Sequence, residues 1–199
     1  MMSIANPVRA LALAGASLAL SACVSFGPEA PPSLLTLTAQ ETVAAGATNS
    51  GTAETALAIY EPVVSQRINV TRVPVQVDAT TVAYLADAVW VEKPARLFKT
   101  LLMETVTARN GRMVVEGEDP TVLAQSRLRG NLRRFGYDAQ AGAVVVQFDA
   151  QRETGNGGAI ETRRFERTVT GVPALAGPVG AALNNAANEV AVEVAAWVQ

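Results

Sequence analysis

The sequence predicts an α+β domain in which a largely antiparallel sheet packs against two amphipathic helices. Short β-branched runs follow one another over residues 55–91, and apolar residues recur at helical spacing in 94–109 and 178–198. The segment 143–151 alternates well between apolar and polar residues, and a Gly-rich turn joins it to a return strand at 159–169. Because runs of strands are interrupted by two helices, rather than alternating strictly with helices, an antiparallel arrangement is favoured.

The N-terminal residues 1–22 have the three-part layout of a secretory signal peptide. Arg9 is the only charged side chain among them, an apolar run covers 10–20, and the segment ends in the small residue Ala22. The run is too short for a membrane-spanning helix, which needs about 20 apolar residues. Cys23 follows directly and is the only cysteine of the chain, so it has no disulfide partner within it.

The stretch L-S-A-C at residues 20–23 resembles the lipobox of bacterial lipoproteins. In such proteins cleavage falls between the positions of Ala22 and Cys23, and the cysteine carries lipid chains such as palmitate. A plain signal peptide or a buried apolar helix is the alternative, but acylation accounts for an unpaired thiol in an exported chain. Two or three acyl chains would anchor the domain stably, whereas one holds only marginally. In bacterial lipoproteins, an aspartate directly after the lipidated cysteine retains the protein at the inner membrane. The resemblance therefore implies that this chain, which has Val24 at that position, lies on the periplasmic face of the outer membrane rather than at the inner membrane.

Residues 23–54 are predicted to form the lipidated start, a tether and a mobile segment. Four Pro and Gly residues within 24–33 disfavour regular structure. The segment 33–38 alternates weakly and could form a first strand, and 39–54 is rich in Ala, Gly, Thr and Ser with little to bury. A single folded domain is therefore predicted at 55–199, with no sign of a repeat or a second domain.

Several strands are expected in the first part of this domain, because β-branched runs there are broken by Pro62 and Pro74. The run 80–91 alternates and predicts another strand. Pro94 suits the first turn of a helix, and Asn110-Gly111 is a stop signal.

The second part is predicted to start with a strand at 112–116 and a turn at 118–120. The segment 124–137 is mixed, with leucines on one face and arginines on the other. After the hairpin, Gly177-Pro178 opens the C-terminal helix, whose apolar stripe indicates core rather than a binding surface.

The composition argues against an enzyme. The chain has no histidine, which excludes histidine-dependent triads and zinc motifs, and its one cysteine is assigned to lipid. No metal and no cofactor are predicted beyond the covalent lipid on Cys23. Glu116, Glu118 and Asp119 cluster, but a carboxylate group in a Pro-containing turn indicates a solvated loop. The formal charge of −2, or −3 once Arg9 is removed, gives no support for nucleic acid as a partner.

Two arginine-rich stretches are candidates for a basic surface. One contains Arg127 and Arg129 and the other Arg163. If the stretches were neighbours in the sheet, they could bind anionic headgroups or an acidic partner. The favoured alternative is that the arginines pair with nearby aspartates and glutamates, as mixed charges on strands usually do.

Order and spacing in the mature chain resemble the ABC-type transport auxiliary lipoproteins, the PqiC/YmbA-like family. Residues 34–37 resemble the opening strand of the family. Tyr60 and Pro62 lie where the family has a leucine-aspartate-arginine-proline type motif, from which Tyr60-Glu61 departs. Trp90, Glu92 and Pro94 are similar to the family's tryptophan-alanine-glutamate-proline signature before a long helix. The resemblance implies structural or interface roles for these residues.

The resemblance also implies a non-enzymatic accessory of a transporter that moves phospholipids or other hydrophobic molecules between two membranes. Its partners would be an MCE-domain protein, an ABC permease and its ATPase, and related members are thought to form rings. Two alternatives stay open. One is an envelope-assembly lipoprotein that partners an outer-membrane β-barrel, and the other is a domain that itself carries lipid in a cavity.

Overall fold

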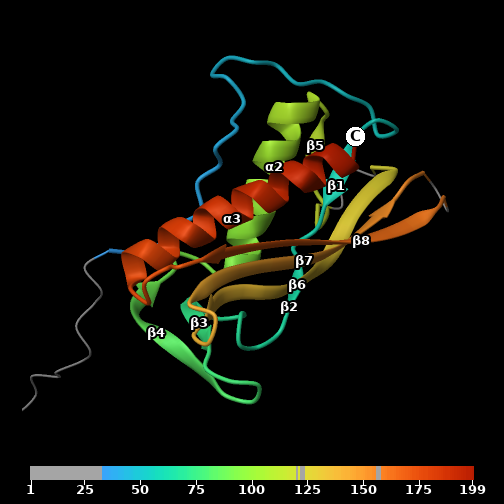
Figure 1. Cartoon of the computed structure of the whole chain (residues 1–199). Coiled ribbons are helices and arrows are strands. Elements are labelled where there is room, and N and C mark those ends of the chain that lie inside the picture. Colours follow the sequence, from blue (N-terminus) through green and yellow to red (C-terminus); the bar gives the residue numbers. More distant parts are fainter. Residues whose placement is uncertain (1–32, 120, 122–123, 156–157) are drawn as a thin grey trace, which may run out of the picture. The chain divides into compact units, whose positions relative to one another are not determined.

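The computed structural model describes residues 33–119, 121, 124–155 and 158–199. Its sheet is organised around the long strand β6 (Ser126–Asp138), which pairs antiparallel with β7 (Ala143–Glu153). Strand β8 (Ile160–Thr170) continues the hairpin outside β7. These three strands form the long, twisted part of the sheet in Figure 1.

The opposite edge of β6 is lined by three short strands in chain order. They are β1 (Leu57–Ile59), β2 (Val63–Val64) and β3 (Arg72–Gln76), and all three run parallel to β6. Strand β4 (Val82–Val89) pairs antiparallel with β3, and β5 (Val114–Glu116) pairs parallel with β1. The sheet is thus mixed, and its long pairings are antiparallel.

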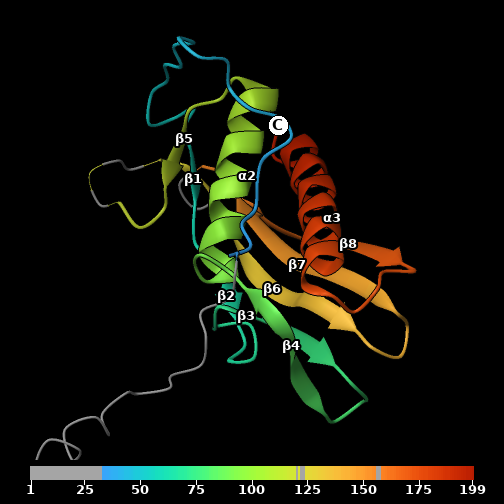
Figure 2. The same cartoon turned by 90° about the vertical axis from the view of Figure 1, so that its left-hand side faces the viewer.

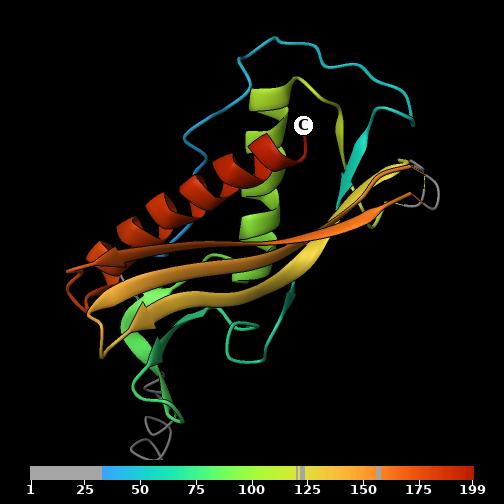
Figure 3. The ribbon, with the colours of Figure 1, turned by 45° about the vertical axis from the view of Figure 1, so that its right-hand side comes forward.

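Both helices cover the same face of the sheet, as Figures 1 and 3 show. Helix α2 (Pro94–Asn110) begins at the expected proline and ends at Gly111, whose φ of 58° suits a left-handed C-cap. Helix α3 (Ala176–Trp197) begins two residues earlier than its predicted start at 178. Among the described residues, neither helix combines the length and hydropathy needed to cross a bilayer. The prediction of an α+β domain with two helices is confirmed.

The core lies between this face and the helices and is built partly on stacked rings. The Phe98 ring of α2 meets Phe148 edge-on at 5.3 Å between centroids, and Trp90 lies 5.6 Å from Phe135. Every second residue of β7 points into this core, as the alternation predicts. These residues are Val144, Val146, Phe148 and Ala150.

A β-bulge explains why residues 124–137 read as mixed. The register of β6 against β7 shifts between Leu132 and Arg134. Leu132 and Phe135, three residues apart, would face opposite sides of a regular strand, yet both are buried. Because the bulge inserts one extra residue between them, Leu132 and Phe135 both point toward the core.

Residues 34–43, which we call the strap, lie along α2 and α3, as Figure 2 shows. Within 33–38 the structure has one β-bridge, between Leu35 and Trp90, and no strand. Alternate strap residues nevertheless pack against the core, namely Leu35, Leu37 and Ala39. The alternation in the sequence therefore indicates which side chains of the strap pack against the core, although the strap forms no strand.

Asparagines of α3 bind the backbone of the strap. Asn188, which is 2% exposed, donates to the Thr38 carbonyl at 2.9 Å and accepts from the Gln40 N–H at 2.8 Å. Asn184 accepts from the Thr38 N–H at 2.8 Å. One end of the segment predicted to be mobile, 39–54, is thereby fixed on helix α3.

Candidate functional site

The predicted lipidation site, Cys23, and the cleavage position at Ala22 lie outside the described residues. The chain enters the described part at residue 33, next to the bridge that Leu35 forms with β4. The remaining candidate residues all lie within the folded domain.

Tyr60 and Pro62 serve the packing around the end of β1. Tyr60 donates its backbone N–H to the Leu128 carbonyl at 3.0 Å. A Cβ at Gly117 would come within 2.4 Å of the Tyr60 ring, so the ring packs directly on the backbone there. The guanidinium carbon of Arg129 lies 4.3 Å from the ring centroid, a cation–π distance. Pro62 is buried just before β2.

Trp90, Glu92 and Pro94 form the junction between β4 and α2. Trp90 is 1% exposed, and its indole nitrogen has no hydrogen-bond partner in the described part of the chain. Pro94 is buried at the first position of α2. Glu92 is exposed and lies 3.8 Å from Arg96, one helical turn on. Two of the three positions are therefore core positions, and Glu92 alone is on the surface.

The acidic cluster contains a buried cation that the sequence did not indicate. The Lys99 side chain is 7% exposed, and its Nζ lies 3.4 Å from Glu116 and 3.3 Å from Glu118. Desolvation raises the pKa of Glu118, but hydrogen bonds from the Glu61 N–H and from Lys99 outweigh it and the pKa is lowered. A hydrogen bond from the Thr121 hydroxyl lowers the pKa of Asp119. A general acid at neutral pH needs a raised pKa, so Glu118 and Asp119 are not suited to proton donation.

The two arginine stretches are not neighbours, because β7 lies between β6 and β8. Asp149 of β7 binds an arginine from each side, with Arg133 Nε at 3.0 Å and Arg164 Nε at 2.6 Å. Hydrogen bonding by Arg164, then by Arg133, lowers the pKa of Asp149 despite its partial desolvation. One carboxylate is thus shared by two arginines, and this group of three side chains keeps a net charge of +1.

The three arginines proposed as a basic surface have different surroundings. Arg127 pairs with Glu153 at 3.1 Å, and Arg129 lies over the Tyr60 ring. Arg163 lies over Phe165, with its guanidinium carbon 4.9 Å from the ring centroid. Strand alternation puts Arg163 on the helix-covered face with Phe165, and Arg127 and Arg129 on the other. The structure does not bring the three together.

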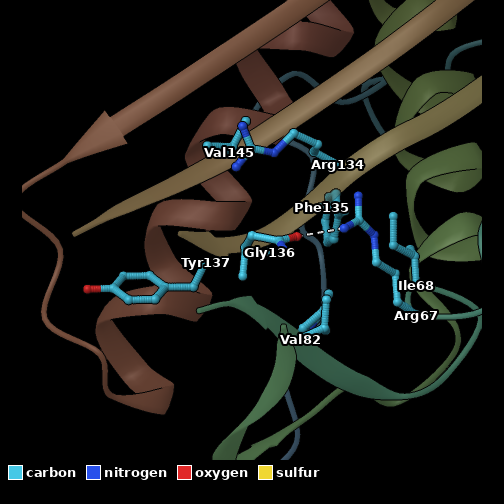
Figure 4. Close-up of a pocket in the computed structure, with 10 residues that line it drawn as sticks. Arg67, Ile68, Val82, Arg134, Phe135, Gly136, Tyr137 and Val145 are labelled. Atoms are coloured by element: carbon cyan, nitrogen blue, oxygen red, sulfur yellow. Dashed lines mark hydrogen bonds between the residues drawn. The ribbon is translucent and has the colours of Figure 1, made fainter. Parts of the chain in front are cut away.

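A pocket of about 20 Å³ lies between β6 and the β3–β4 hairpin (Figure 4). Arg67 and Arg134 line it from different directions, and Arg67 donates to the Gln76 side chain at 2.7 Å. This volume holds about one water molecule. The pocket is too small for an acyl chain.

Sequence reasoning also missed a clamp at Arg112. Its guanidinium donates to the carbonyls of Thr55, at 2.6 Å, and Val198, at 3.1 Å, so it joins the start of β1 to the C-terminal end of α3. Desolvation lowers the pKa of Arg112. An isolated arginine before a strand carries no sequence signal for this role, because its acceptors are backbone groups far away in the chain.

The described residues thus form an α+β domain with surface ion pairs and no group of three His, Cys, Asp or Glu side chains that could hold a metal. The family model of the ABC-type transport auxiliary lipoprotein component matches residues 35–195. The chain belongs to this family. No functionally curated protein shows significant sequence similarity to it.

Solved structures that are similar to the domain include two crystal structures. One is of protein XCC0632 from Xanthomonas campestris, assigned to the family DUF330, with 18% identity and a TM-score of 0.67 over 83% of this chain and 94% of that one. The other, of an uncharacterized protein, has 12% identity and a TM-score of 0.65 over 84% of this chain and 100% of that one. At these identities the similarity establishes the fold. Family membership supports an accessory role in transport and an association with the cell envelope.

Proposed function

We propose that this chain is a lipid-anchored periplasmic accessory of an ABC-type transport system and that it acts by docking rather than by catalysis. The observation that carries the proposal is the family match over 35–195, which follows a stretch similar to a lipobox whose Cys23 is the only cysteine of the chain.

The anchor would keep the domain close to the bilayer. Ten residues, 24–33, separate Cys23 from the strap, and a fully extended chain spans at most about 3.6 Å per residue, or about 36 Å in all. A short tether gives a high effective concentration of the domain at the membrane, which favours docking to membrane-bound partners.

The finer assignment follows from the family resemblance. The partners would be an MCE-domain protein, a permease and its ATPase, and the cargo would be phospholipid or another hydrophobic molecule. Val24 after the lipidated cysteine favours the outer membrane. Exposed side chains of the sheet face without helices, such as Arg133, would be available to a partner.

The anchor is tested by metabolic labelling with an alkyne-bearing palmitate analogue. We expect label on the wild-type chain and none on Cys23→Ala at matched expression. Label that persists in Cys23→Ala, or is absent from the wild type, would contradict lipidation at this residue.

The partners are tested by in-cell crosslinking of the tagged chain, detergent extraction and mass spectrometry. Permease, ATPase and MCE subunits should be enriched with the wild type and depleted with Cys23→Ala. Recovery of an outer-membrane β-barrel without any transporter subunit would overturn the transport assignment.

A further inference from the structure

Strand β8 presents a long open edge. All eleven of its residues, Ile160 to Thr170, pair with β7 without a register shift. Its other edge has no strand partner in the part of the chain that the structure describes. Figure 3 shows this strand along the rim of the sheet.

Natural proteins usually protect such an edge with charged side chains, lysine above all, or with a proline, a bulge or a covering segment. Strand β8 contains no proline, no lysine and no bulge, but five of its eleven residues are charged, namely Glu161, Arg163, Arg164, Glu166 and Arg167. The other residues favour strands, and Ile160 at its start is 61% exposed. The edge is therefore suited to a partner strand that places complementary charges against these five residues.

We propose that the β8 edges of two copies of this chain pair antiparallel about a twofold axis at Phe165. This register pairs all eleven residues of each strand, with Ile160 opposite Thr170. It extends the sheet continuously from one copy to the other.

On the sheet face without helices, this register places opposite charges and pairs of threonines directly across from one another. Arg164 of one copy lies opposite Glu166 of the other, and the pair occurs twice because of the symmetry. Thr162 lies opposite Thr168, also twice. Opposite charges and threonine pairs in directly opposed positions stabilise antiparallel strands.

On the helix-covered face, the register resolves the one unfavourable pairing. Arg163 lies opposite Arg167, and Arg167 contacts two carboxylates, those of Glu189 and Glu193. That cluster has one positive and two negative charges, a net charge of −1. Arg163 has no carboxylate within 4.0 Å among the described residues. Each unpaired Arg163 therefore meets the surplus negative charge of the other copy.

This inference does not depend on the proposed transport role or on the anchor. It also differs from the ring that the family resemblance implies, because a twofold contact closes after two copies whereas a ring needs a head-to-tail contact. The experiments below distinguish these arrangements.

Disulfide crosslinking tests the register. We would express the full chain carrying Thr162→Cys and Thr168→Cys together, oxidise the membranes with copper phenanthroline and run non-reducing gels. Within one strand the two positions are about 20 Å apart, so they cannot bond to each other. Across the twofold axis they are opposed, and we expect a reducible dimer.

The single variants Thr162→Cys and Thr168→Cys are matched controls that should stay monomeric, because neither position opposes itself. The wild type reports any disulfide through Cys23. A dimer from a single variant as strong as from the double variant, a ladder of larger species, or no dimer from the double variant would each overturn the proposal.

Charge reversal tests the contact energetically. Glu166→Arg places an arginine directly opposite Arg164 of the other copy, twice because of the symmetry, and we expect the crosslink yield of the double-cysteine chain to fall at least tenfold. Glu54→Arg makes the same charge change at an exposed residue outside β8 and should leave the yield unchanged. Unchanged thermal unfolding of both variants shows that the domain is intact. Equal yields in both, or a β8 cysteine that crosslinks to a different protein, would contradict pairing between copies.

Discussion

Lys99 is a buried cation between two carboxylates that are largely exposed, at 60% for Glu116 and 48% for Glu118. Removing the cation leaves two carboxylates that can be hydrated. Removing both negative charges leaves a positive charge on a side chain that is only 7% exposed, with no counter-charge beside it. Removing one partner of a buried ion pair is most costly when the partner that remains is a buried charge.

We therefore expect Glu116→Gln with Glu118→Gln to lower the free energy of unfolding by about 2 kcal/mol or more, and Lys99→Met by about 1 kcal/mol or less. Urea unfolding followed by circular dichroism measures both. Arg96→Met, which removes an exposed partner of Glu92, is the control and should have almost no effect. A larger loss for Lys99→Met than for the double glutamate variant would contradict this account.

Asp149 makes stability depend on pH in a defined direction. Its pKa lies below the ordinary value of 3.8, chiefly because Arg164 donates hydrogen bonds to it. A lowered folded-state pKa contributes stability above the unfolded-state pKa, and that contribution is lost as the pH falls through the folded-state pKa.

Asp149→Asn should therefore be less stable than the wild type at pH 7, and the difference should shrink once the pH falls below the ordinary value of 3.8. The midpoints of urea unfolding of the two proteins, measured at pH 7 and at a pH below 3.8, test this expectation. A difference that stays constant down to acid pH would show that the loss comes from packing and not from the charge.

For single residues, the sequence predicted that the arginines would form ion pairs more readily than it predicted which residues would be their partners. It favoured ion pairs for the arginines, and Asp149 does bind Arg133 and Arg164. It gave no sign of the buried Lys99, since the partners of that lysine lie on and after β5, 17 and 19 residues along the chain.

Among the elements, the strap depends on one buried side chain. Asn188 satisfies both a carbonyl and an N–H of the strap, and also donates to the Asn184 carbonyl at 2.8 Å. Without its amide, the Thr38 carbonyl, the Gln40 N–H and the Asn184 carbonyl each lose this partner. An unmet buried hydrogen-bonding group costs about 1–3 kcal/mol.

Asn188→Ala should lower the free energy of unfolding by about 2 kcal/mol and raise amide hydrogen exchange in residues 35–43. Asn185→Ala is the matched control on the same helix, because Asn185 is exposed and its side chain accepts a hydrogen bond from the Gln40 side chain, at 3.2 Å, rather than from the strap backbone. Equal exchange in the two variants would show that the amide of Asn188 does not hold the strap.

The elements themselves were predicted to different degrees, for a physical reason. Helix periodicity and the Pro94 and Gly111 signals are local, and both helices were predicted to within two residues. The β7–β8 hairpin also follows from a local turn. The parallel pairing of β1, β2 and β3 with β6 is nonlocal. The sequence pattern of residues 57–59 or 63–64 does not indicate which strand, 60 or more residues away, will pair with them. The bulge of β6 is likewise set by β7.

In the whole molecule, helices and strap together close one side of the sheet. The sequence alone placed the start of the domain at residue 55, because 39–54 carries few large apolar residues. In the structure Leu35 packs on Gly180 of α3, and Leu35, Leu37 and Ala39 join the core. The family match likewise begins at residue 35. The strap therefore behaves as part of the domain in its packing.

A soluble chain that begins at residue 33 should then unfold in one cooperative transition, and a chain that begins at residue 55 should be less stable by about 3 kcal/mol or more. The loss combines the partly buried Leu35 and Leu37, at up to about 2 kcal/mol each, with the strap's hydrogen bonds to Asn184 and Asn188. Thermal and urea unfolding of the two chains measure it. Equal midpoints would show that residues 33–54 only rest on a domain that is complete without them, since a segment whose packing is part of the core cannot be removed without exposing the surface that it covered.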